Sequence, residues 1–219
     1  MLIYHDGVRQ FLDAVEGDVP DCEAISENVA SFLKTLPTSY KHPDFLNLFY
    51  QLGYHYIENG FYQFGVLNGF SLFSFALGAL KKNANAKITA NDLFDLYEFN
   101  KGSLIEFQKS SEYLNLQNNI SINQKSVLDP HYRFIGELSE EFNVIDLSNC
   151  GEIFESVLEQ FTTSKSRLIC FEGGARERDE VGWMKKFNRR QITPVLEKFS
   201  SKFEVHVLTL YPSFTLIKK

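Results

Sequence analysis

The stretch that decides the fold is FYQFGVLNGFSLFSFALGAL, which runs from Phe61 to Leu80. Residues 61–64 are mostly aromatic and typical of a short strand, whereas residues 71–81, which are small or apolar up to Leu80, predict a helix. Gly65 and Gly69 stand at the junction. Positions without a side chain let the backbone turn sharply and let a ligand approach it closely. The stretch therefore predicts a strand–loop–helix unit with a ligand pocket.

Alternation of short strands and helices continues along the chain. We expect further strands at 87–90, 120–122, 142–147 and 167–171, and helices at 102–116, 151–161 and 178–188. Thr193 and Pro194 read as the N-cap and first turn of another short helix. Residues 203–210 and 214–217 are two strands joined so tightly that they predict an antiparallel hairpin. The pattern predicts an α/β, doubly wound and mostly parallel sheet that ends in this hairpin.

The residues before the first of these strands have a helical pattern. Apolar residues recur at helical spacing from Ile25 and stop at Pro37, and a second helix is expected from Pro43. We therefore divide the chain into an N-terminal helical cap or extension, residues 1–58, and a Rossmann-like domain, residues 59–219.

Composition limits the classes of function. The 219 residues are 44% hydrophobic and 23% charged, which is enough to form a real core. A net charge of −6 argues against nonspecific binding to nucleic acid or to an anionic membrane. The three cysteines are odd in number and far apart, which argues against a zinc or disulfide scaffold. With no signal-peptide pattern and no long apolar run, we expect a reduced, cytoplasmic protein with a small-molecule partner. A homo-oligomer is left open.

Asp92 ends the strand that follows the glycine loop, 23 residues after Gly69. An acid at that position is placed to accept hydrogen bonds from ribose hydroxyls, as in dinucleotide sites. The loop is not Gly-x-Gly-x-x-Gly, however, and the chain closes in a hairpin rather than a second βαβ half. Both features argue against NAD. A tight turn without a ligand, and a helix N-cap role for Asp92, are the structural alternatives.

The segment GVLNGFSL, residues 65–72, resembles the Gly-Val-x-x-Gly-x-Ser motif of class I S-adenosylmethionine-dependent methyltransferases. With ANDLF at 90–94, it looks most like the macrocin O-methyltransferase and cephalosporin-hydroxylase branch, over roughly residues 42–219. The resemblance implies a seven-stranded sheet with S-adenosylmethionine across its carboxyl edge. It implies that the cofactor is bound by Gln63, Gly65, Val66, Asn68, Gly69, Ser71, Asn91, Asp92, Ser126 and Asp146.

The catalytic candidates follow later strands. Asp146 and Glu172 end the fourth and fifth strands, and His131 lies in a loop at the same edge, where it could act as a general base. Solvated loop carboxylates and an ordinary loop histidine are the alternatives. The resemblance also has departures: Gln63 and Lys125 stand where the family usually has acids, and Gly173 replaces a second acid after the fifth strand. We therefore predict no metal site and keep Mg²⁺ as the less favoured alternative.

Arg176 and Arg178 lie close after the fifth strand and are candidates to bind an anionic substrate, with an ordinary amphipathic helix as the favoured reading.

The sequence as a whole predicts a methyltransferase that methylates an oxygen of a small polar molecule, such as a sugar or natural-product hydroxyl. The alternatives are a binding protein on a decayed methyltransferase scaffold, and a nucleotide-dependent oxidoreductase or sugar-modifying enzyme.

Overall fold

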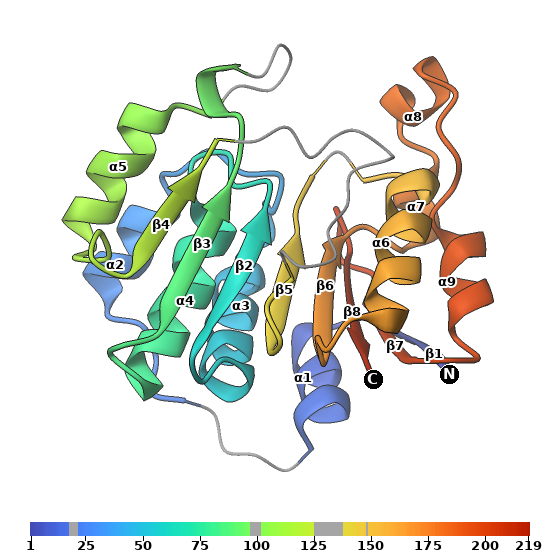
Figure 1. Cartoon of the computed structure of the whole chain (residues 1–219), viewed down its shortest axis with the longest axis horizontal. Coiled ribbons are helices and arrows are strands. Elements are labelled where there is room, and N and C mark those ends of the chain that lie inside the picture. The colour runs from blue at the N-terminus through green and yellow to red at the C-terminus, as the bar shows by residue number, and fades with distance from the viewer. Residues whose placement is uncertain (18–21, 97–101, 125–137, 148) are drawn as a thin grey trace. The chain divides into compact units, whose positions relative to one another are not determined.

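The structure is a computed structural model that describes residues 1–17, 22–96, 102–124, 138–147 and 149–219 (Figure 1). The chain divides into two compact units. We call residues 18–126 the glycine-loop unit, and residues 1–17 together with 127–219 the hairpin unit.

The glycine-loop unit is built on three parallel strands in the order β2-β3-β4. The pairing aligns Phe64 with Asn91, and Asn91 with Asn123, so three strand ends lie in register. The strands are β2 (Gly60–Phe64), β3 (Lys87–Asn91) and β4 (Ile120–Asn123), and the helices are α2 (Glu27–Leu33), α3 (Asp44–Tyr56), α4 (Phe70–Lys82), the 3-10 helix η1 (Phe94–Leu96) and α5 (Leu104–Tyr113).

Helices α3 and α4 pack against each other very closely (Figure 1). A Cβ atom on Gly53 would lie 2.2 Å from the carbonyl oxygen of Phe75, and one on Gly78 would lie 2.0 Å from that of Tyr50. Both glycines are therefore required by the approach of the two backbones, although glycine weakens an isolated helix. The apolar stripe expected after Pro43 is buried along this contact, with Phe45, Phe49 and Leu52 fully inaccessible.

The hairpin unit carries five strands in the order β1-β7-β8-β6-β5. β5 and β6 are parallel, β8 runs antiparallel to both β6 and β7, and β1 is parallel to β7. The strands are β1 (Leu2–His5), β5 (Phe142–Ile145), β6 (Leu168–Glu172), β7 (Glu204–Leu208) and β8 (Phe214–Lys218), and the helices are α1 (Val8–Glu16), α6 (Gly151–Thr163), α7 (Arg176–Asp179), α8 (Gly182–Lys186) and α9 (Thr193–Phe199).

The expected fold class is confirmed: an α/β chain, mostly parallel, that closes in the antiparallel hairpin β7–β8. The strand count differs, because the described residues form eight strands rather than seven. The additional strand is β1, at the start of a segment that we expected to be helical. Its register places Leu2 beside Val205 and His5 beside Leu208, so β7 supplies the backbone partners that a four-residue strand cannot supply alone.

The helix expected at 178–188 is also corrected. It is interrupted after Asp179, and Val181 has extended backbone angles before α8 begins. Arg178 and Asp179 are both buried by contacts to other elements, whereas Phe187 is 51% exposed. Thr193 likewise is the first helical residue of α9 rather than its cap, and the Asp179 carboxylate accepts the backbone N–H groups of Ile192 and Thr193.

In the described part of the chain, no helix has both the length and the apolar character needed to cross a bilayer.

Candidate functional site

The loop between β2 and α4 has the conformation that its two glycines predict. Gly65 and Gly69 have φ angles of 83° and 95°, and Leu67 between them also has a positive φ of 54°. Gly69 is the N-cap of α4 in the left-handed region, and a Cβ there would lie 2.3 Å from the Phe73 ring. A side chain at position 69 would therefore be strained by the backbone and crowded by the ring.

Asp92 holds this loop by its carboxylate. Oδ2 accepts the backbone N–H of Val66 at 2.5 Å and that of Leu67 at 2.8 Å, and Oδ1 accepts the N–H of Phe94 at 2.7 Å. The loop and the next strand end are thus joined as the sequence predicts, and the half-buried Asp92 points toward the junction.

These bonds limit what Asp92 can offer a ligand. A carboxylate has about four lone-pair positions, and three of them are occupied by N–H groups of the protein. Among the described residues no donor takes the remaining position, on Oδ1, so the expected pair of ribose hydroxyls would need a rearrangement. A role in ribose binding stays a prediction, and the observed role is to fix the loop.

Gln63 stands where the resembled family usually has an acid, and it is fully buried. Its Nε2 donates to the carbonyl of Gly65 at 2.9 Å and to Ser71 Oγ at 2.8 Å. Within the residues that the structure describes, its Oε1 has no hydrogen-bond partner. A buried amide oxygen beside the glycine loop suits a ligand that brings a hydrogen-bond donor, such as the ammonium group of S-adenosylmethionine.

Two other predicted cofactor residues have structural partners. Asn91 is buried and donates to the carbonyl of Gln63 at 3.3 Å, while its oxygen accepts from Asn123 at 3.2 Å. Asn68 Oδ1 accepts the backbone N–H of Ser103 at 3.0 Å. Asn91 therefore ties the strand ends together, and Asn68 holds Ser103, the N-cap of α5. Val66 is buried, and its N–H is bound to Asp92 as described above.

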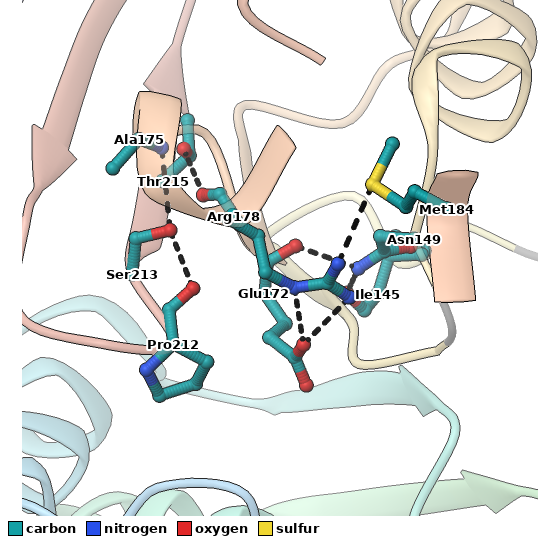
Figure 2. Close-up of polar contacts among 10 residues, drawn as sticks. Ile145, Asn149, Glu172, Ala175, Arg178, Met184, Pro212, Ser213 and Thr215 are labelled. Atoms are coloured by element: carbon teal, nitrogen blue, oxygen red, sulfur yellow. Dashed lines mark hydrogen bonds and ion pairs between the residues drawn. The ribbon is translucent and has the colours of Figure 1, made fainter. Parts of the chain in front are cut away.

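In the hairpin unit, β5 and β6 end in the two predicted acids. Asp146 follows β5 directly and is half-buried, and Glu172 is the last residue of β6. Glu172 Oε1 accepts from Arg178 Nε at 3.1 Å and from Arg178 Nη2 at 3.0 Å (Figure 2). The side chains of Arg178 and Glu172 are only 4% and 12% exposed, so the ion pair is almost fully withdrawn from water.

This pair changes the expected role of Arg178. A candidate for binding an anionic substrate is neutralised by Glu172, and its guanidinium lies 5.0 Å from the Trp183 ring. Arg176 is exposed. Arg178 therefore tethers the α7–α8 segment to the end of β6, and breaking the pair would leave a charge buried without its partner.

Asn149 lies beside the same strand ends. Its Nδ2 donates to the carbonyl of Ile145 and to that of Glu172, both at 2.9 Å, and so joins the ends of β5 and β6 (Figure 2). The side chain is fully buried, and in the described residues its Oδ1 has no hydrogen-bond partner. Asn149 was not among the site residues predicted from the sequence. A buried amide is recognisable in sequence only by residue type, which does not reveal its partners.

The Gly173–Gly174 turn after β6 is held from the hairpin. Both glycines have positive φ angles, 106° and 114°, and Thr215 Oγ1 donates to the carbonyl of Gly173 at 2.6 Å. Ser213 Oγ accepts the N–H of Ala175 at 3.2 Å (Figure 2). The two glycines thus serve a turn that β8 supports.

Two predicted site residues, Ser126 and His131, lie outside the described residues. In the described ranges, no group of three or more histidine, cysteine or acidic residues is arranged to hold a metal ion.

A second buried titratable cluster lies in the hairpin unit. His5 Nε2 and His206 Nδ1 are 3.1 Å apart, and His206 Nε2 is 2.8 Å from Glu204 Oε1. If His206 donates to Glu204, its Nδ1 accepts from His5, and His5 Nδ1 is left as a buried acceptor without a partner in the described residues. Burial lowers the pKa of both imidazoles, and the neighbouring His206 lowers the pKa of His5 further. His206 is almost fully buried.

No protein-family model and no curated protein matches this sequence. Solved structures do resemble it. The O-methyltransferase TomG from Streptomyces achromogenes, involved in tomaymycin synthesis and solved with S-adenosylmethionine, is 11% identical with a TM-score of 0.61, over 96% of this chain and 95% of its own. An O-methyltransferase from Bacillus cereus, solved with S-adenosylhomocysteine, is 16% identical with a TM-score of 0.57, over 97% of each chain.

A third similar structure is precorrin-6y C5,15-methyltransferase from Geobacter metallireducens. It is 13% identical with a TM-score of 0.54, over 90% of this chain and 98% of its own. At these identities the likeness concerns the fold. The chain has the Rossmann-like fold of class I S-adenosylmethionine-dependent methyltransferases.

Proposed function

We propose that this protein is an S-adenosylmethionine-dependent methyltransferase that methylates a hydroxyl oxygen of a small polar molecule, such as a sugar or a natural product. The observation that carries the proposal is the left-handed Gly65–Gly69 loop, which Asp92 fixes. Beside it lies the buried Oε1 of Gln63, which has no hydrogen-bond partner among the described residues. The fold shared with proteins solved with S-adenosylmethionine or S-adenosylhomocysteine supports it. The closer likeness to the macrocin O-methyltransferase branch stays a prediction from sequence.

The chemistry asks little of the protein beyond positioning. S-adenosylmethionine supplies a methyl group that is already activated as a sulfonium, so the protein must orient the two reactants and take a proton from the acceptor. Asp146, Glu172 and His131 stay the candidates for contact with the acceptor. Because Glu172 Oε1 already accepts two N–H groups of Arg178, we assign Glu172 mainly to holding the α7–α8 segment.

Isothermal titration with S-adenosylmethionine and S-adenosylhomocysteine tests the proposal. We expect binding by the wild type and strong loss in Gly69→Val, because that change puts a branched side chain where φ is 95° and the Phe73 ring is within 2.3 Å. Gly17→Val is a matched control, since Gly17 also has a positive φ, 72°, but open space around it. No heat at near-millimolar ligand for the wild type would reject the cofactor assignment.

A non-catalytic binding protein on the same fold is the second candidate, and the neutral Gln63 in place of an acid favours it. It predicts cofactor binding without methyl transfer to any hydroxylated substrate pool. An oxidoreductase or sugar-modifying enzyme predicts instead that NAD(H) or a nucleotide sugar raises the melting temperature while S-adenosylhomocysteine does not.

A further inference from the structure

The side chains of Arg178 and Asn149 both bind Glu172: Arg178 binds the carboxylate of Glu172, and Asn149 binds its backbone. Arg178 donates to Glu172 Oε1, and Asn149 donates to the Glu172 carbonyl oxygen. Figure 2 shows both side chains around Glu172, with dashed lines from each of them to that residue. The two side chains are 4% and 0% exposed. They therefore form one buried polar cluster within the hairpin unit.

This cluster has an acceptor left over. The two partners of the Asn149 amide are carbonyl oxygens, which fixes its nitrogen toward them and its oxygen away from them. That oxygen has no donor among the described residues, although it is inaccessible to water. Buried amide oxygens nearly always have a donor, so a missing one points to a group that is brought in.

The cluster also has weakly used donors. Of the five N–H groups of Arg178, two bind Glu172 Oε1 and one on Nη1 faces the Met184 sulfur at 3.6 Å. A thioether is a poor acceptor, and methionine is a flexible side chain that changes rotamer at little cost. The contact with Met184 is therefore the one that a better acceptor would replace.

We propose that Asn149 and Arg178 form a subsite for a neutral hydroxyl group of the methyl acceptor. The hydroxyl oxygen takes the place of the Met184 sulfur and accepts from Arg178 Nη1, while the hydroxyl hydrogen is donated to Asn149 Oδ1. An anion fits less well, because Glu172 already balances the charge of Arg178 and the amide oxygen would face a second acceptor. This inference rests on the proposed function for the identity of the ligand, but the subsite can be tested without it.

Three probes that share one ring separate the possibilities: phenol, which donates and accepts; anisole, which only accepts; and benzoate, which is anionic. Each is titrated by ligand-observed NMR against the full chain, with and without S-adenosylhomocysteine. We expect phenol to bind and anisole to bind at least about tenfold more weakly, because anisole lacks the hydrogen that Asn149 Oδ1 would accept. Equal binding of phenol and anisole, a preference for benzoate, or no binding of any probe would overturn the proposal.

Variants locate the effect. Asn149→Ala should weaken phenol binding about tenfold, whereas Met184→Ala should preserve or strengthen it by opening the space. Asn143→Ala is the matched control: this buried amide of β5 has its nitrogen bound to Ser139 and Ser166 and its oxygen bound to the Ser139 N–H. Unchanged phenol binding in Asn149→Ala would reject the subsite. If the alanine variants fail to fold, the phenol–anisole comparison on the wild type still decides.

S-adenosylhomocysteine binding is read separately by calorimetry. If the wild type does not bind S-adenosylhomocysteine but still binds phenol more tightly than anisole, the proposed function is rejected and the subsite stands. If the wild type binds S-adenosylhomocysteine but does not distinguish phenol from anisole, the subsite alone is rejected.

Discussion

Replacing Asp92 by asparagine removes the acceptor on which three backbone N–H groups of the glycine-loop unit depend. An amide has only one oxygen, so the asparagine can accept either the backbone N–H groups of Val66 and Leu67 or the backbone N–H of Phe94. Its NH₂ group then faces donors on the other side. Hydrogen bonds to a charged group contribute roughly 1.5–3 kcal/mol each. One or two bonds are lost, and because Asp92 is half-buried we take the low end for each and expect a loss of about 1.5–3 kcal/mol in the free energy of unfolding.

Urea denaturation of the full chain measures this loss, and titration with S-adenosylhomocysteine measures its effect on the loop. Asp95→Asn is the matched control, since in the described part of the chain its exposed carboxylate accepts one backbone N–H, that of Leu104, at 3.0 Å. We expect that variant to lose less than about 1 kcal/mol. If Asp92→Asn were as stable as the wild type, the carboxylate would not hold the loop. The hydrogen bonds of Asp92 would then not be the reason why the Gly65–Gly69 loop has its observed conformation.

The remaining predictions concern the hairpin unit. Arg178→Met should lower the free energy of unfolding by about 3–5 kcal/mol, because Glu172 would remain as a buried charge without its partner. Adding Glu172→Gln should recover part of this loss, and an equally large loss in the double variant would count against a stabilising Arg178–Glu172 ion pair. The pKa of His5 and His206 is lowered below the reference of about 6.5, so the unfolded chain takes up protons first as the pH falls. Stability should therefore be full above pH 6.5 and decline below it, with a shallower decline in His206→Gln, and a flat urea midpoint between pH 7.5 and 5.5 would contradict this. Burial raises the pKa of Cys150 to about 11. At pH 8, Cys150 should therefore react with a thiol reagent far more slowly in the native protein than in urea-unfolded protein, and equal rates would contradict the burial of Cys150.

Local pattern was enough to place most of the strands and helices. The glycine loop, the helix after it and the closing hairpin are each set by residues a few positions apart, and the structure has all three. Contacts between distant segments explain the failures. β1 is a strand because β7, some two hundred residues later, offers it a parallel edge. The helix expected at 178–188 is interrupted where Arg178 and Asp179 turn inward to Glu172 and α9.

The candidate site divides in the same way. The sequence determined that two glycines and an acid meet at neighbouring strand ends, because side-chain-free positions and parallel strands leave few other arrangements. Only the tertiary structure decided what those groups bind. Asp92 is bound to the backbone of the loop, Glu172 to Arg178, and Asn149 to two strand-end carbonyls. A hydrogen bond depends on distances of a few tenths of an ångström between segments that are far apart in the chain, and residue spacing carries no information about those distances.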